Sequence, residues 1–110
     1  MLQNLLTNLP QNLTNELFET LVDAKSVKIE RILSKGQQTP AGKWYDQDQH
    51  EWVLVVAGGA KIVFEDGSRV VMGPGDHLLL EAHRKHRVSW TDPDQTTVWL
   101  AVHWTECQTG

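Results

Sequence analysis

From residue 26 onward, the chain is divided into short strand-like runs that are separated by turn-forming residues. There are roughly seven or eight such runs, at intervals of about ten residues. Residues 27–33 alternate in polarity, which is typical of a strand with one buried face. Residues 51–57 (EWVLVVA) are apolar on both sides after the first residue, which is typical of a strand covered on both faces. This series predicts an all-β sandwich or barrel rather than an alternating α/β fold.

Two turn motifs indicate how the runs are connected. Residues 66–67 (DG) separate two apolar runs, and the glycine supplies the positive φ that a tight hairpin needs. Residues 73–76 (GPGD) form a second turn, which precedes a strand at 77–81. Further strands are expected at 86–91 and 96–104.

The first 25 residues have a different pattern. Four leucines between residues 2 and 9 fall at helical spacing, but Pro10 prevents a helix from continuing. After it, Thr14 is a candidate cap for a short helix, and its apolar stripe begins at Leu17 and Phe18. We therefore expect an N-terminal arm and short helix at 1–25 and the β-barrel at 26–106. Together they form one domain, because 110 residues offer too little apolar surface for a second core.

Composition and charge limit which kinds of partner and which cellular compartment are expected. A net charge of −4 argues against a protein that binds nucleic acid through the phosphate backbone. No run approaches the roughly 20 apolar residues that span a membrane, and the N-terminus does not have the pattern of a secretion signal. Cys107 is the single cysteine, so an intrachain disulfide is excluded. We expect a cytoplasmic protein whose partner is a small-molecule ligand, with no nucleic acid and no membrane.

Two motifs in residues 27–104 resemble those of the cupin superfamily, which consists of small β-barrels of the jelly-roll type. The first cupin motif contains paired histidines, then a glutamate and then a glycine, and Glu51 and Gly58 hold the last two places. The second motif runs through Pro-Gly-Asp and a short strand to a histidine, which residues 74–76 and His86 match. The resemblance implies a cupin-type jelly-roll β-barrel with an interior cavity.

The chain departs from the family at the paired histidines. Counting back from the glutamate of the motif, these positions fall on Tyr45 and Gln47, or on Trp44 and Asp46. Neither choice supplies an imidazole. The three side chains Trp44, Tyr45 and Gln47 are therefore candidates for lining a ligand pocket, where an aromatic wall with few polar groups is typical of a small-molecule site.

Of the four metal ligands that the resemblance implies, two remain, namely Glu51 and His86. A divalent ion such as Zn, Fe, Ni or Mn usually needs three or four protein ligands, so a metal would have to recruit others. The candidates are His83, His50, Gln47 and Tyr45, and His83 is the best of them. His83 is expected in a loop, whereas strand alternation argues against His50 and Glu51 facing the same cavity. His77 and His103 are interpreted as ordinary packed or surface histidines.

Three functions fit these features. The first is a metal-dependent oxygenase, isomerase or lyase that acts on a small polar molecule, with Tyr45 as the catalytic residue that donates or accepts a proton. The second is a metal-free binding, sensor or accessory module without catalysis. The third is assembly, because edge strands of small barrels commonly pair and the arm at residues 2–9 is long enough to lie across a partner subunit. We expect a homodimer in each case.

Overall fold

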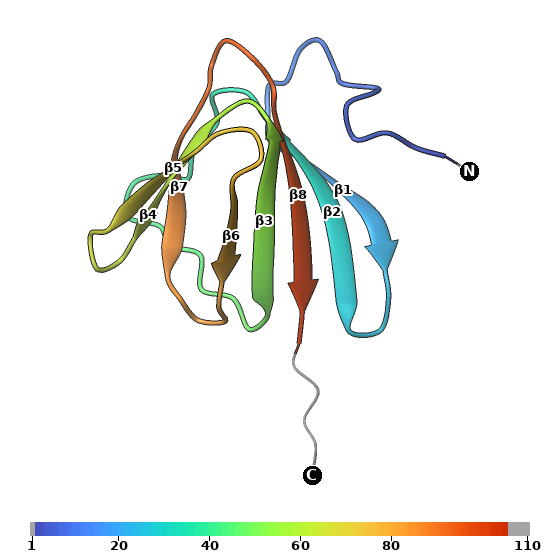
Figure 1. Cartoon of the computed structure of the whole chain (residues 1–110). Helices are drawn as coiled ribbons and strands as arrows, with labels where there is room; N and C mark the ends of the chain where they lie inside the picture. The colour runs from blue at the N-terminus through green and yellow to red at the C-terminus, as the bar shows by residue number, and fades with distance from the viewer. Residues whose placement is uncertain (1, 106–110) are drawn as a thin grey trace.

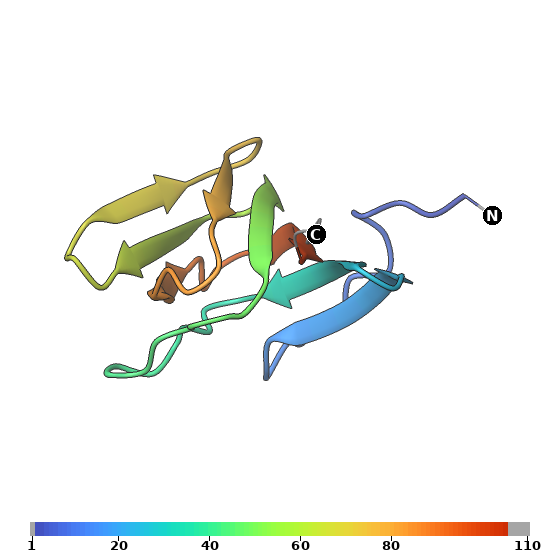
Figure 2. The same ribbon diagram turned by 90° about the horizontal axis from the view of Figure 1, so that it is seen from below.

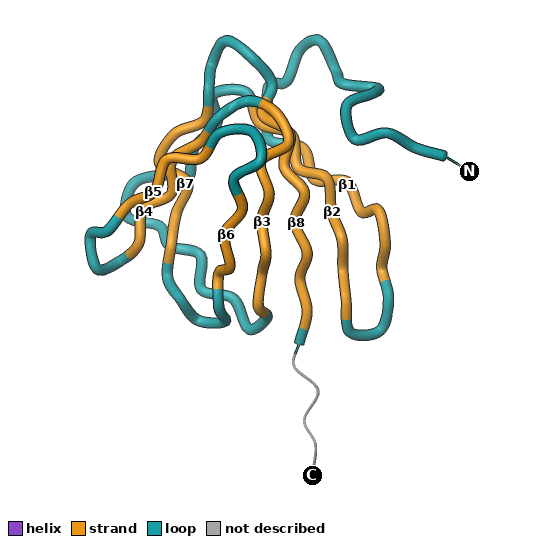
Figure 3. The backbone as a smooth tube through the Cα atoms, viewed as in Figure 1, coloured by secondary structure: helices purple, strands orange, loops and turns teal. Residues whose placement is uncertain are grey.

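The computed structural model describes residues 2–105, so Cys107 lies outside the described residues. These residues form strands, turns and loops but no helix (Figure 3). The strands are β1 (Leu17–Asp23), β2 (Val27–Ser34), β3 (His50–Ala57), β4 (Ala60–Phe64), β5 (Arg69–Met72), β6 (His77–Leu80), β7 (His86–Thr91) and β8 (Thr97–Trp104). The prediction of an all-β fold is confirmed. Within this part of the chain, there is also no helix that could cross a membrane.

The strands form two antiparallel sheets. One sheet has five strands in the order β1-β2-β8-β3-β6, and these lie side by side in Figure 1. The other has three strands in the order β5-β4-β7. In the view from below, β4 and β5 lie on one side of the molecule and β1 and β2 on the other (Figure 2). The central strand β8 pairs with both β2 and β3, which brings the beginning, middle and end of the barrel sequence together.

The prediction of a short N-terminal helix is wrong, because β1 occupies that segment. β1 pairs with β2 from Leu17, opposite Leu33, to Asp23, opposite Lys28. A short isolated helix is costly to nucleate, whereas pairing with β2 satisfies the backbone along the whole segment. A bulge between Thr20 and Val22 breaks the strict alternation.

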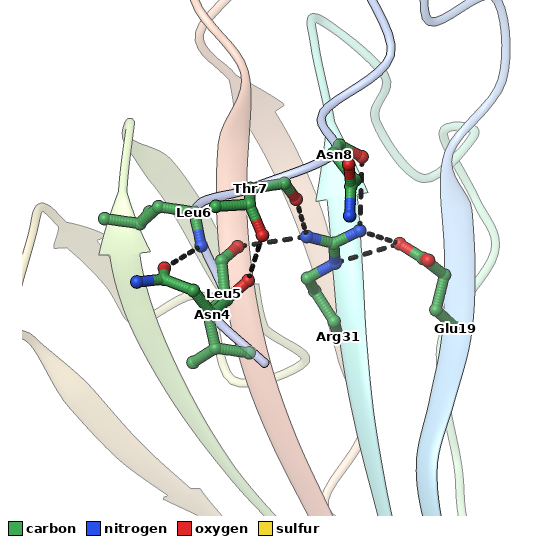
Figure 4. A network of polar contacts seen from close by, with 7 residues as sticks. All are labelled: Asn4, Leu5, Leu6, Thr7, Asn8, Glu19 and Arg31. Atoms are coloured by element: carbon green, nitrogen blue, oxygen red, sulfur yellow. Dashed lines mark hydrogen bonds and ion pairs between the residues drawn. The ribbon is translucent and has the colours of Figure 1, made fainter. Parts of the chain in front are cut away.

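The N-terminal arm covers β2 at Arg31, on the face of the sheet that points away from the cavity. Arg31 is only 7% exposed. Its Nη1 donates hydrogen bonds to the carbonyl oxygens of Leu5 (3.1 Å) and Thr7 (2.7 Å), and its Nε donates to Glu19 Oε1 at 2.9 Å (Figure 4). The one-sided burial expected for residues 27–33 is therefore incomplete. The arm supplies the cover that the alternating pattern does not reveal.

The core lies between the two sheets. Its buried members are Val53, Val55, Ala60, Ile62, Phe64, Met72, Leu80, Trp99 and Ala101. On β3 and β8, these residues alternate with side chains on the outer face, as the pleat of a strand requires. The inward face of the same two strands continues beyond the apolar core to Glu51 and His103, so polar side chains also enter the interior.

Both predicted turns are present. Asp76 N donates to Gly73 O at 3.0 Å, and Gly75 has φ +89°, which is the geometry that a Pro-Gly turn of type II requires. The turn is attached to β3, because Gly75 N donates to Val55 O at 2.7 Å. The hairpin between β4 and β5 has Gly67 at φ +90°, as the Asp-Gly pair predicts.

Candidate functional site

A cavity of about 110 Å³ lies between the two sheets. Its walls come from both sheets and from the loop between β2 and β3. The lining residues are Glu16, Phe18, Glu30, Ile32, Tyr45, Gln47, Glu51, Val53, Ile62, Leu80, His86, Val88, Trp99 and His103. Half of them are apolar, and the polar ones are carboxylates, imidazoles, one phenol and one amide. An apolar pocket with a few convergent polar groups is the usual form of a small-molecule site.

The strand register brings one histidine between two glutamates. His103 on β8 lies opposite Glu51 on β3, and Glu30 on β2 lies opposite Ala101, two residues from His103 along β8. Since residues two apart on a strand share a face, all three polar side chains point into the same space. His103 Nε2 is 3.0 Å from Glu30 Oε1 and 3.7 Å from Glu51 Oε2.

These three side chains form the carboxylate–imidazole cluster, and they are largely shielded from water. Glu30 and Glu51 are 9% and 7% exposed. His103 Nε2 is buried and forms no hydrogen bond within residues 2–105, although both carboxylates are within ion-pair distance. A buried carboxylate needs a partner, and the imidazole lies between two of them, while Lys28 Nζ is 3.9 Å from Glu30 Oε2 at the outer end of the cluster. A proton can therefore move between the imidazole and either carboxylate. Alternatively, an N–H or O–H group of a ligand can take the place of His103 as the partner of Glu30 or Glu51.

Two further polar groups adjoin Glu51 on the loop side of the cavity. Gln47 Nε2 donates to Glu51 Oε1 at 3.1 Å. Tyr45 forms a bridge with His86 through two backbone hydrogen bonds, and their rings stack with centroids 5.6 Å apart. Tyr45 and Gln47 thus occupy the cavity wall. Of the two alignments open for the paired-histidine positions, this is the one whose residues face the interior.

The orientation of His86 follows from its hydrogen bond to the backbone. His86 Nδ1 is 2.8 Å from Arg84 O, and a carbonyl oxygen can only accept. In the neutral ring, Nδ1 therefore carries the proton and Nε2 carries the lone pair. His86 is 5% exposed and lines the cavity, so the ring presents a fixed tautomer there.

Burial changes the acidity of two groups at the cavity wall. It raises the pKa of Glu16 above its usual value, and the hydrogen bond from Ser34 Oγ to Glu16 Oε2 (2.7 Å) opposes this in part. Burial also raises the pKa of Tyr45, with a further contribution from the charge of Glu16. The phenol of Tyr45 is therefore protonated at neutral pH and available as a hydrogen-bond donor.

One donor on the wall has no acceptor. Trp99 is 4% exposed, and its Nε1 is buried without a hydrogen-bond partner in the described part of the chain. Most buried polar groups in folded proteins are paired, and an unpaired N–H costs about 1–3 kcal/mol. Since Trp99 lines the cavity, an acceptor on a bound molecule can supply the missing partner.

Three residues proposed from the sequence lie outside the cavity. His83 is in an exposed loop with φ +64°, and its Nδ1 is 2.8 Å from Asp46 Oδ1. His50 lies on the outer face of β3, where its Nδ1 accepts a hydrogen bond from Ala82 N at 3.0 Å. Trp44 is partly exposed beneath the guanidinium of Arg87. The alternation argument about His50 therefore agrees with its observed position.

The remaining donor set does not fit a divalent transition metal at the family's position. Glu51 and His86 are strong ligands, but the other two places hold an amide bonded to Glu51 and a phenol stacked on His86. No group of three or more His, Cys, Asp or Glu side chains within residues 2–105 has an arrangement that could hold a metal ion. Three or four strong ligands are usual for such ions.

Sequence reasoning does not place three polar residues on the cavity wall, Glu16, Glu30 and His103, nor the indole N–H of Trp99. The interpretation of His103 as an ordinary packed or surface histidine overlooks its place between two carboxylates inside the barrel. A signal is present in the closing strand, where Trp99, Ala101 and His103 alternate with outward residues. The pairing register that places Glu30 and Glu51 beside His103 has no comparable local signal.

Comparison with known proteins identifies the same family as the sequence motifs. The family model for the Cupin domain matches residues 31–103. The chain is 48% identical to a protein of known crystal structure from Ralstonia eutropha JMP134, which has the provisional name mannose-6-phosphate isomerase. That match covers 96% of this chain and 99% of the other, with a TM-score of 0.92.

Two other solved structures share the fold at low sequence identity. A cupin superfamily protein from Desulfitobacterium hafniense DCB-2 is 17% identical, with 89% and 84% of the two chains covered and a TM-score of 0.73. The DMSP lyase DddQ from Ruegeria pomeroyi DSS-3 is 18% identical, with 86% of this chain and 49% of that chain covered and a TM-score of 0.70. No curated protein matches the sequence.

Proposed function

The chain belongs to the cupin family, and from this premise we propose that its barrel cavity binds one small polar organic molecule without a resident metal ion. The observation that carries this proposal is the carboxylate–imidazole cluster of Glu30, Glu51 and His103 at an otherwise apolar cavity. The cluster supplies acceptors for ligand N–H and O–H groups. The apolar wall supplies the burial that makes such hydrogen bonds strong.

The wall also has donors that suit an oxygen atom of the ligand. Trp99 Nε1 is without a partner, and the phenol of Tyr45 is protonated at neutral pH. The loop that carries Tyr45 and Gln47 is fixed to β7 by backbone hydrogen bonds between Tyr45 and His86. The site is therefore assembled before a ligand arrives, which reduces the entropy that binding would otherwise cost.

A thermal-shift screen of small polar metabolites on metal-stripped protein tests this proposal. A molecule that binds only the folded state raises the melting temperature by mass action. We expect at least one compound to raise it in the presence of a chelator, and we expect Glu51→Gln to weaken that response. Trp44→Phe is the matched control, because this substitution alters an aromatic side chain outside the cavity. A response that requires added metal for every compound would contradict the metal-free function.

The second candidate function is that of a metal-dependent isomerase, lyase or oxygenase. It is favoured by His86, whose Nε2 has a free lone pair in the neutral ring, and by retention of Glu51 nearby on the cavity wall. The provisional name of the Ralstonia eutropha relative also refers to an isomerase. Zn, Fe, Ni and Mn are the ions to test. Elemental analysis of protein purified without a histidine tag distinguishes the two functions, because the second requires about one metal ion per chain.

A further inference from the structure

The cavity wall has acidic side chains but no lysine or arginine among the described residues. Three carboxylates line it, those of Glu16, Glu30 and Glu51. None of the described residues that line the cavity is a lysine or an arginine. Phosphate and carboxylate ligands are usually recognised by arginine, by lysine or by several backbone N–H groups. In a site of low dielectric, an anion would instead experience repulsion from all three carboxylates.

The two imidazoles do not reverse this balance. His86 Nδ1 is occupied by the carbonyl oxygen of Arg84, and His103 Nε2 lies between Glu30 and Glu51. Even with both rings protonated, the lining residues carry three negative groups and two positive ones. Lys28 Nζ is 3.9 Å from Glu30 Oε2, but its side chain is 44% exposed and does not line the cavity, so the wall itself remains unfavourable for an anion.

The unpartnered indole N–H defines what a compatible ligand must offer. Trp99 Nε1 is buried, its residue is 4% exposed, and no acceptor among residues 2–105 satisfies this donor. A hydroxyl or carbonyl oxygen of a ligand would accept its hydrogen bond without bringing negative charge. The carboxylates of Glu30 and Glu51 would in turn accept hydrogen bonds from O–H or N–H groups of the same molecule.

From these three observations, we propose that the cavity selects an uncharged or cationic hydroxyl-bearing molecule and excludes phosphorylated and other anionic compounds. This inference rests on the proposed function, because it names the ligand class for the same site. We therefore do not expect this chain to bind a sugar phosphate such as the one in the provisional name of its Ralstonia eutropha relative. The lining has no lysine or arginine side chain to hold a phosphate.

The test compares compounds that share a carbon skeleton but differ in charge. Full-length, metal-stripped protein is titrated by calorimetry with serinol (an amine), glycerol (an alcohol) and glycerol phosphate, which share a three-carbon skeleton. Further sets of three use larger carbon skeletons, each again with one amine, one alcohol and one phosphate. We expect the amine or the alcohol of each responding set to bind at least tenfold more tightly than the phosphate. A phosphate that binds best in its set would overturn the ligand class while leaving the cavity as a binding site.

Two variants connect the charge preference to this wall. Glu51→Gln keeps the shape and removes one charge, so it should reduce the preference against phosphate severalfold. Trp99→Phe removes the unpartnered donor but keeps an aromatic ring, so it should weaken binding of hydroxyl compounds more than binding of matched compounds that lack the hydroxyl. Because it also removes buried volume from the core, its binding is measured at a temperature well below its own melting temperature. An unchanged preference in Glu51→Gln contradicts the electrostatic argument. No binding by any compound of any set overturns the proposed function itself.

Discussion

At the scale of single residues, His103 determines how acidic side chains can occupy the barrel interior. It lies within ion-pair distance of both Glu30 and Glu51, which are buried. Without it, the carboxylates from β2 and β3, the two strands that flank β8, would keep only the half-exposed Lys28 beside Glu30 and the amide of Gln47 beside Glu51 within the described chain. Like charges at close range are destabilising in a space of low dielectric.

His103→Leu should therefore lower the free energy of unfolding at neutral pH by about 2 kcal/mol or more, because it leaves two buried carboxylates without their shared partner. Urea denaturation measures the change. The control is His77→Leu, at an exposed histidine on the outer face, which should change stability by no more than about 0.5 kcal/mol. Equal effects of the two substitutions would contradict the role given to the cluster.

Glu16 gives a pH-dependent prediction. Burial raises its pKa in the folded state above the usual value of 4.5, so folded protein binds more protons than unfolded protein between these two values. Stability from this group is therefore complete below pH 4.5 and is lost as the pH rises through the folded pKa. Glu16→Gln cannot ionise and retains an oxygen that can accept from Ser34 Oγ.

We accordingly expect Glu16→Gln to melt at a higher temperature than wild type at neutral pH, with the difference disappearing below pH 4.5. Thermal denaturation followed by circular dichroism across this pH range is sufficient. A lower melting temperature of the variant at neutral pH would show that ionised Glu16 stabilises the fold, contrary to the account.

At the scale of strands and turns, Gly58 shows why the glycine of the first cupin motif is required. It follows β3 with φ +88°, and a Cβ added there would lie 2.5 Å from Thr97 Cα. Gly67 has φ +90° as well, but a Cβ added to it would meet no atom within 4 Å. Both glycines thus adopt a positive φ, which other residues rarely adopt. Only Gly58 also lies so close to β8 that a side chain would not fit.

Gly58→Ala should consequently destabilise the protein by at least about 2 kcal/mol more than Gly67→Ala, since only the first substitution adds a clash with backbone to the strain of positive φ. Chemical denaturation of both variants gives the difference. If the two alanine variants lost equal stability, the close contact between Gly58 and Thr97 would be of no consequence.

The elements that the sequence predicts correctly are those with local signals. The hairpin at residues 66–67 and the turn at residues 73–76 are encoded by residues that adopt the required φ values themselves. β1 resembles a helix in its sequence because its conformation depends on pairing with β2, which follows later in the chain. The same limit applies to the site. Glu51 and His86 can be found through motifs, whereas His103 and Glu30 meet only through strand register.

At the scale of the whole molecule, the exposed apolar side chains concentrate on one edge of the larger sheet. β1 is one of the two edge strands of this sheet, and Leu17, Phe18, Leu21 and Val22 are all more than a third exposed, whereas the other edge strand, β6, has only Leu79 in this class. Leu2 and Leu6 of the adjoining arm are exposed as well. An apolar edge strand is prone to pair with another chain unless it is covered. We propose that a second copy of this chain covers it in a homodimer.

Light scattering at micromolar concentration should give the mass of a dimer for the wild type and a lower mass for Leu21→Lys, which places a charge on this edge. Val71→Lys is the matched control. Val71 is 68% exposed on β5, the edge strand of the smaller sheet, and its substitution should leave the dimer intact. A monomeric wild-type protein would remove this proposal and leave the arm as a cover for β2 alone.

Residues distant in the sequence converge on one cavity, where we propose that a small polar molecule binds. Nitrogen-15 NMR of the histidine side chains tests it most directly, with the compound that gives the largest thermal shift as the probe. We expect ligand addition to shift the ring signals of His86 and His103, which line the cavity, and to leave those of His77 and His83 in place. Shifts at His77 or His83, with unchanged signals from His86 and His103, would contradict it.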